Sequence, residues 1–152
     1  MIFSALVWIV VQFCVLAGPI AIPFELPMTE QKPKTVILVV DDEPLLRMDL
    51  EDSLYITGCQ VVGAGNADEA LAVLSRRNDI GLVVTDIQMP GSMDGLGLLR
   101  TIRDRWPPVR IMIASSHTRF EPGQVPPDVP IFSKPFAYAS INAKARQLLE
   151  ME

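Results

Sequence analysis

Short, wholly apolar runs alternate with stretches of helical periodicity from residue 36 onward, and this alternation constrains the fold more than any other feature. The run at 36–40, VILVV, is typical of a strand that is covered on both faces. Further strands are predicted at 60–64, 82–85, 110–114 and 131–133, and helices at 44–55, 66–77, 96–106 and 138–150. The repeated strand–helix order predicts an α/β fold, a doubly wound parallel sheet with helices on both faces.

The side chains of two segments lead to more detailed expectations. In the helix at 44–55, the buried stripe is expected to consist of Leu45, Leu46, Met48, Leu50 and Leu54. Between residues 116 and 131, by contrast, the chain has four prolines and only scattered apolar residues. Because proline breaks helices, the helix expected before the last strand is short or absent.

Composition narrows the classes of function. The chain has 152 residues, with 13 basic and 18 acidic side chains and a net charge of −5, so nucleic acid is not an expected partner. Its two cysteines, Cys14 and Cys59, cannot build a disulfide framework or a cysteine-based metal site. A multi-histidine metal site is excluded as well, because His117 is the only histidine.

The segment 1–27 differs in character from the rest of the chain. Residues 1–24 carry no charged side chain and are long enough to cross a bilayer, which takes about 20 apolar residues. The segment is either a membrane anchor or an upstream extension of a start at Met28 that the cell does not translate. Because the first bases are Lys32 and Lys34, an anchor would leave the remaining chain in the cytoplasm. We expect a linker at 28–35 and a cytoplasmic domain at 36–152.

Polar side chains stand where the predicted strands end. The first strand is followed by Asp41 and Asp42 and the third by Asp86, while Ser115 and Lys134 follow the fourth and fifth. The carboxyl ends of the strands of an open doubly wound sheet share one edge, where ligands bind. We therefore expect these five residues to converge on one site.

The chemistry of this set favours phosphoryl transfer. Neighbouring carboxylates repel one another unless a cation lies between them, and oxygen ligands select a hard cation such as Mg²⁺. Lys134 and Ser115 supply a positive charge and a hydroxyl for phosphoryl oxygens, which leaves Asp86 as the nucleophile that forms an acyl phosphate. No GxxxxGK[ST] loop is present, so the phosphoryl donor is not expected to be ATP bound by this chain.

Four motifs in this order, VVDDEP, VVTDIQMPGSMDG, IMIASSH and FSKPF, resemble the signature blocks of response-regulator receiver domains of two-component signalling. The resemblance covers about residues 34–152. It implies a flavodoxin-like fold with five strands in the order 2-1-3-4-5. It also implies that Asp86 is the phosphoacceptor, which receives phosphate from a sensor histidine kinase or a phosphotransfer protein.

The same resemblance assigns the metal ligands. It implies that Asp42 and Asp86 bind Mg²⁺ directly, that Asp41 does so through a water molecule, and that the backbone carbonyl of Gln88 completes the protein ligands. Mg²⁺ is the only cofactor it implies.

The chain departs from the family pattern in two places, at residue 131 and in the proline-rich stretch that replaces the family's fourth helix. Ser115 takes the place of the family's hydroxyl residue, and Lys134 that of its lysine, with a cis bond to Pro135. The family usually has a tyrosine or phenylalanine three residues before the lysine, as the switch coupled to the hydroxyl residue. Here that position is Ile131, with Phe132 next to it. The phosphoryl-transfer chemistry is expected to be intact. How phosphorylation is coupled to an output surface does not follow from the family pattern.

We expect a stand-alone receiver that signals through a protein partner, because only one helix follows Lys134 and no DNA-binding module can be attached there. One alternative is an Mg²⁺-dependent phosphatase with an aspartyl nucleophile. Such an enzyme needs a second acid, typically two residues after the nucleophile, where this chain has Gln88. Another alternative is a docking module that needs no phosphate, against which the complete acid, serine and lysine set argues. The expectation is therefore a phosphoacceptor and not an enzyme.

Overall fold

The protein is described here by a computed structural model that covers residues 35–117 and 119–151. The membrane anchor or untranslated extension expected at 1–27, and nearly all of the linker, lie outside these residues. Within them, no helix combines the length and the apolar character that crossing a membrane requires.

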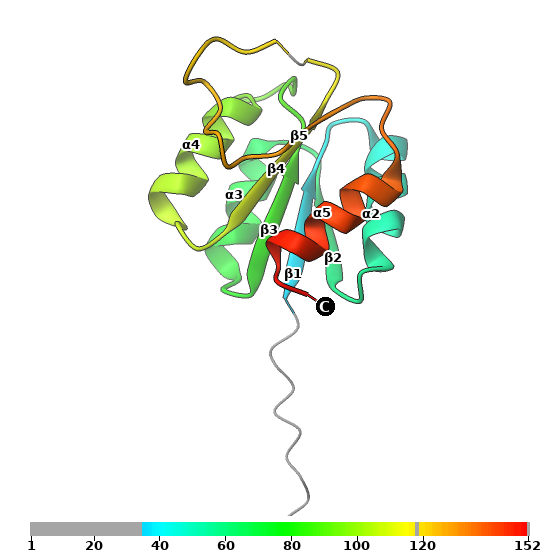
Figure 1. The fold of residues 1–152 in the computed structure, drawn as a ribbon. Helices are drawn as coiled ribbons and strands as arrows, with labels where there is room; N and C mark the ends of the chain where they lie inside the picture. The colour runs from blue at the N-terminus through cyan, green and yellow to red at the C-terminus, as the bar shows by residue number, and fades with distance from the viewer. Residues whose placement is uncertain (1–34, 118, 152) are drawn as a thin grey trace, which may run out of the picture. The chain divides into compact units, whose positions relative to one another are not determined.

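A parallel sheet of five strands has the order β2-β1-β3-β4-β5, as predicted (Figure 1). The strands are β1 Val36–Val40, β2 Gln60–Ala64, β3 Ile80–Thr85, β4 Arg110–Ser115 and β5 Ile131–Ser133. β3 begins two residues earlier than predicted, because Ile80 pairs with Val36 before an irregularity in the register. The glycine that follows Ile80 interrupts the apolar run and hides this start in the sequence.

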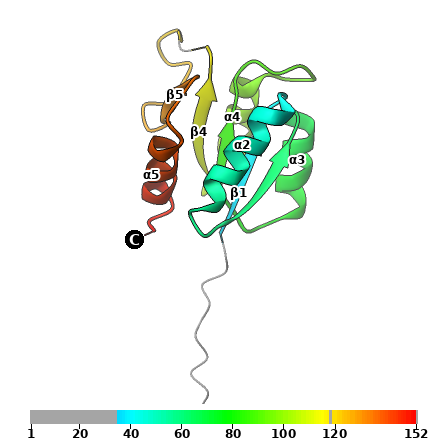
Figure 2. The same ribbon diagram turned by 90° about the vertical axis from the view of Figure 1, so that its right-hand side faces the viewer.

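Two helices cover each face of the sheet (Figures 1 and 2). One face packs against α3 Ala67–Arg76 and α4 Gly95–Arg105, and the other packs against α2 Pro44–Tyr55 and α5 Tyr138–Leu148. Between β4 and β5, the described residues 116, 117 and 119–130 contain no helix, which agrees with the proline-rich sequence. Val129 of this segment is buried in the core, and Asp128 forms an exposed ion pair of 2.6 Å with Arg103 of α4.

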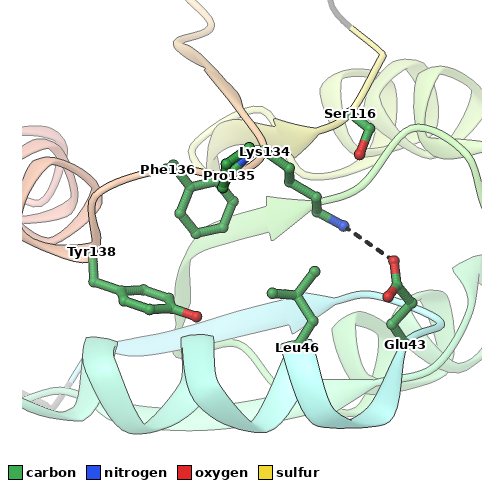
Figure 3. Close-up of a pocket in the computed structure, with 7 residues that line it drawn as sticks. All are labelled: Glu43, Leu46, Ser116, Lys134, Pro135, Phe136 and Tyr138. Atoms are coloured by element: carbon green, nitrogen blue, oxygen red, sulfur yellow. Dashed lines mark ion pairs between the residues drawn. The ribbon is translucent and has the colours of Figure 1, made fainter.

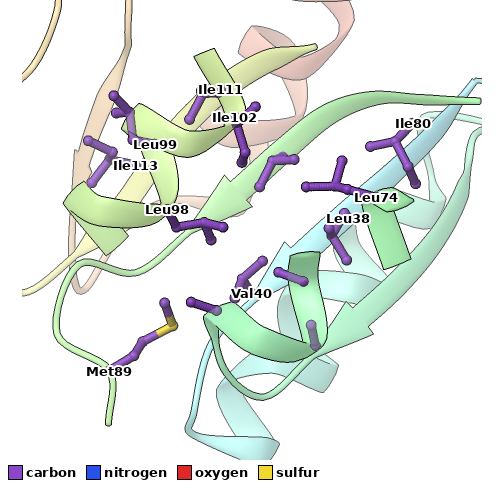
Figure 4. Close-up of a cluster of buried hydrophobic side chains, with 14 of the residues drawn as sticks. Leu38, Val40, Leu74, Ile80, Met89, Leu98, Leu99, Ile102, Ile111 and Ile113 are labelled. Carbon is purple, nitrogen blue, oxygen red and sulfur yellow. The ribbon is translucent and has the colours of Figure 1, made fainter. Parts of the chain in front are cut away.

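The central strand shows how the sequence builds the core. All five side chains of β1 are buried, with Val36, Leu38 and Val40 on the α3/α4 side and Ile37 and Val39 on the α2/α5 side. Figure 4 shows the first of these clusters, to which Leu38 of β1, Leu74 of α3 and Leu98 of α4 all belong. A strand buried on both faces needs an unbroken apolar run, which is what VILVV supplies.

The expected stripe of α2 is wrong at two positions. Leu50 and Leu54 are buried against the sheet, whereas Leu45 is 78% exposed and Met48 is 56% exposed. At about 100° per residue, Leu50 and Leu54 share one face of a helix, while Leu45 and Met48 project to the other side. The buried face of this helix is therefore narrower than the number of its apolar residues suggests.

Gly95, the first residue of α4, lets this helix approach the end of β3. A Cβ atom on Gly95 would overlap the backbone oxygen of Asp86 and lie 2.7 Å from the Cα atom of Ile87. We expect Gly95→Ala to lower the free energy of unfolding by about 2 kcal/mol, because the rigid backbone must move apart. Urea denaturation measures this loss. As a control, Gly97→Ala should cost far less, because its Cβ meets only the side chains of Met93 and Asp94; an equal loss in both variants would contradict the argument.

Candidate functional site

The five polar residues expected to converge lie together at the carboxyl edge of the sheet. Ser115 is the last residue of β4, and Asp41, Asp86 and Lys134 each follow directly on β1, β3 and β5. One carboxylate oxygen from each of Asp41, Asp42 and Asp86 lies within 4.8 Å of the others. Residues far apart in the sequence thus form one acidic site, as the strand order requires.

Lys134 is the cation of this site. Its Nζ atom donates to Oδ2 of Asp41 and to Oδ2 of Asp86, both at 2.8 Å, and its side chain is only 9% exposed. Burial by itself would lower the pKa of Lys134, but the hydrogen bonds and charges of Asp41 and Asp86 outweigh burial and raise that pKa above its ordinary value. The ammonium group is therefore charged and partly neutralises two buried acids.

Four donors fix the carboxylate of Asp86. Its Oδ1 atom accepts hydrogen bonds from the backbone N–H groups of Ile87 at 2.6 Å and Gln88 at 3.2 Å, and from the Ser115 hydroxyl at 2.6 Å. Lys134 donates to Oδ2, the other oxygen. Asp86 is 6% exposed, and these hydrogen bonds give its carboxylate one preset orientation at the edge of the sheet.

The structure separates the two adjacent serines that the sequence leaves equivalent. Ser115 is fully buried, and its hydroxyl both donates to Asp86 and accepts from the backbone N–H of His117 at 3.2 Å. Ser116 is exposed and lines a neighbouring pocket. Of the two hydroxyls, the one on Ser115 therefore contacts the acidic site.

Asp41 and Asp42 are not the caps of the helix that follows them. Glu43 is the N-cap residue of α2, and its side chain makes no capping hydrogen bond. Asp41 lies deeper, 2% exposed, where Oδ1 accepts from the N–H of Glu43 at 2.9 Å and Oδ2 accepts from Lys134. Its backbone oxygen accepts from Arg47 at 2.7 Å, which ties the acidic loop to α2.

A pocket of about 460 Å³ opens beside the acids (Figure 3). It is lined by Glu43, Leu46, Ser116, Lys134, Pro135, Phe136 and Tyr138. Sequence reasoning missed Glu43, whose Oε1 atom lies 3.9 Å from Nζ of Lys134. Its position directly after two site acids was the only available signal, and a partner 91 residues away cannot be read from sequence spacing.

β5, the strand that precedes Lys134, carries one exposed aliphatic side chain. Ile131 is 41% exposed. It is aliphatic at the position where the family usually has an aromatic switch residue. Its neighbour Phe132 is half-buried and packs against the α2/α5 cluster on the other face. The peptide bond between Lys134 and Pro135 is cis.

Comparisons with known proteins agree on one family. A family model described as the response regulator receiver domain matches residues 37–125, more than half of the chain. The phyllosphere-induced regulator PhyR of Methylorubrum extorquens is 33% identical over 116 residues, which cover 76% of this chain and 43% of PhyR. The response regulator protein FleR of Pseudomonas aeruginosa is 38% identical over 81 residues, which cover 53% of this chain and 17% of FleR. The chain thus spans less than half the length of these relatives.

Solved structures of whole receivers match the fold closely. The response regulator protein TrrA from Thermotoga maritima, in complex with Mg(2+)-BeF, has a TM-score of 0.68 at 30% identity, covering 75% of this chain and 98% of TrrA. A response regulator receiver protein from Sinorhizobium medicae has a TM-score of 0.71 at 32% identity, covering 78% and 96%. Because the family model, the sheet order and these structures agree, the chain belongs to the response regulator receiver domains of two-component signalling.

Proposed function

We propose that this chain is the phosphoacceptor receiver of a two-component phosphorelay and that Asp86 accepts the phosphoryl group. The observation that carries the proposal is the buried, preoriented Asp86 carboxylate between Lys134 and Ser115. The donor is a phosphohistidine of a sensor histidine kinase or of a phosphotransfer protein.

The transfer is an in-line displacement at phosphorus. An oxygen of the Asp86 carboxylate forms the new O–P bond while the P–N bond of the phosphohistidine breaks, and its electron pair stays on the imidazole that leaves. Lys134 offers an ammonium charge and Ser115 a hydroxyl donor to the phosphoryl oxygens. Both groups already contact Asp86, so little reorganisation is needed.

The acids also fit a divalent cation. Asp41, Asp42 and Asp86 bring carboxylate oxygens within 4.8 Å of one another, which is the donor chemistry of Mg²⁺, and the backbone carbonyl of Gln88 would complete the protein ligands. In this role Asp42 and Asp86 would hold the ion directly, and Asp41 would hold it through water. When bound, Mg²⁺ supplies charge that offsets the phosphoryl oxygens. The Mg(2+)-BeF complex of TrrA supports this assignment by similarity.

The proposed output is contact with a protein partner on the cytoplasmic side, and not catalysis. A phosphatase would need an acid where this chain carries Gln88, an exposed amide that cannot protonate a leaving group. We propose that phosphorylation changes the surface near Ile131 and the segment 116–130. The Ser115 hydroxyl, which contacts Asp86, also accepts a hydrogen bond from the backbone N–H of His117 in that segment.

Intact-mass measurement after treatment with acetyl phosphate tests the proposal. We expect one phosphoryl adduct per chain in the presence of Mg²⁺ and none in the presence of a chelator. Hydroxylamine should remove the adduct, because it cleaves acyl phosphates. An adduct that forms equally well without Mg²⁺, or that resists hydroxylamine, would contradict the proposed chemistry.

We further propose that residues 36–152 form the receiver domain without help from 1–27. A chain that begins at Met28 should fold and accept phosphate to the same extent as the full chain, because the five strands and the helices on both faces lie after residue 35. Thermal unfolding of both chains, with the full chain in detergent, measures this. A clearly lower midpoint for the short chain would mean that 1–27 contributes to the stability of the domain.

A further inference from the structure

Glu43 occupies a position in the pocket that its role in the helix does not explain. It is the N-cap residue of α2, yet its side chain caps no backbone N–H group. Its side chain is 67% exposed and directs Oε1 toward Lys134 at the mouth of the pocket (Figure 3). An exposed ion pair at 3.9 Å contributes little to stability. The carboxylate therefore stands at the mouth of the pocket, where its charge can act on a molecule that enters.

The pocket beside the acidic site, which it meets at Lys134, has a mixed surface. The pocket has apolar walls at Leu46, Pro135 and Phe136, and its polar groups belong to Glu43, Ser116, Lys134 and Tyr138. Lys134 already faces the buried acids Asp41 and Asp86. Glu43 thus adds a negative charge on the outer side of the ammonium group, away from the buried nucleophile Asp86. In an in-line displacement the leaving group also lies on the side away from the nucleophile.

Small phosphoryl donors differ in the charge of that leaving group. Zwitterionic phosphoramidate carries three protons and a positive charge on nitrogen; when the O–P bond to Asp86 forms, the P–N electron pair stays on nitrogen, which leaves as neutral ammonia. Acetyl phosphate transfers the same group, but its C–O–P oxygen keeps the electron pair and leaves as acetate. A nearby carboxylate attracts the positively charged nitrogen of phosphoramidate and repels the negative charge that develops on the departing acetate.

We propose that Glu43 makes this site selective for donors whose phosphoryl group is bonded to a positively charged nitrogen, over acyl phosphates. The inference rests on the proposed function and names the donor class of that same site. A phosphohistidine protonated on its second nitrogen belongs to this class, and its flat ring suits a pocket of about 460 Å³ with apolar walls. Glu43 is a specificity determinant, and Asp86 remains the nucleophile.

The test compares phosphorylation rates with phosphoramidate and with acetyl phosphate, followed by intact mass at saturating Mg²⁺. We expect the ratio of the two rates to fall roughly tenfold in Glu43→Gln, because the removed charge interacts with opposite signs in the two reactions. Glu43→Asp should keep most of the ratio. Asp49→Asn, the same change of charge at an exposed position of α2 outside the pocket, should leave it unchanged.

A second measurement needs no variant. In the wild type, the ratio should fall as ionic strength rises, because salt screens an exposed charge. An unchanged ratio in Glu43→Gln, with both rates altered alike, would overturn the inference and leave the proposed function standing. A wild type that takes up phosphate from neither donor would overturn the proposed function itself.

Discussion

Asp86→Asn is expected to abolish the phosphoryl adduct while the domain stays folded. An amide is not a nucleophile toward phosphorus under these conditions, so no acyl phosphate can form at this position. The new side chain has the same shape, and its amide oxygen can still accept from the N–H groups of Ile87 and Gln88. Lys134 keeps its second partner, Asp41, at 2.8 Å. We therefore expect a loss of the adduct without a large loss of stability.

Intact mass after acetyl phosphate and Mg²⁺ measures the adduct, and thermal unfolding shows that the variant is folded. Asp52→Asn is the matched control, because it makes the same chemical change at an exposed position of α2 and should still take up one phosphoryl group. A hydroxylamine-sensitive adduct on folded Asp86→Asn would assign the phosphoacceptor to another acid.

The sequence predicts the convergence of the site because convergence follows from strand order alone. Each of Asp41, Asp86, Ser115 and Lys134 stands at the end of an apolar run, and parallel strands bring such ends to one edge. No knowledge of side-chain conformations is needed for this step. The same argument does not give the hydrogen bonds of Asp86, which depend on backbone N–H groups in the loop after β3.

Features that depend on a helix's orientation or on loop geometry escaped the prediction. The apolar composition of α2 suggests five buried side chains, but only the positions that face the sheet are covered, and Leu45 projects into solvent. Glu43 reaches Lys134 across a turn whose geometry is set by Asp41 accepting the Glu43 N–H. In the proline-rich segment, the sequence predicts that the helix is short or absent, but it does not predict the pairing of Asp128 with Arg103.

Lys134→Ala is expected to produce the largest change in stability. The variant leaves Asp41 and Asp86, whose side chains are 3% and 7% exposed, without their cation. Removing one partner of a buried ion pair leaves uncompensated charge, so the free energy of unfolding should fall by about 3 kcal/mol in the presence of a chelator. Urea denaturation measures this loss. Lys134→Met, which keeps most of the apolar stem, should show nearly the same loss, because charge and not volume is missing.

Mg²⁺ should restore much of this stability, which distinguishes electrostatic loss from lost packing. A cation that binds the native acids but not the unfolded chain stabilises the fold by mass action. The gain on adding Mg²⁺ should be larger in Lys134→Ala than in the wild type, where the ammonium group already offsets the charge of Asp41 and Asp86. Lys144→Ala is the control, because Lys144 contacts the neutral Gln147 on α5 and its loss should be small and independent of Mg²⁺. If Lys134→Ala is as stable as the wild type in chelator, then the two carboxylates do not depend on Lys134 for their charge balance.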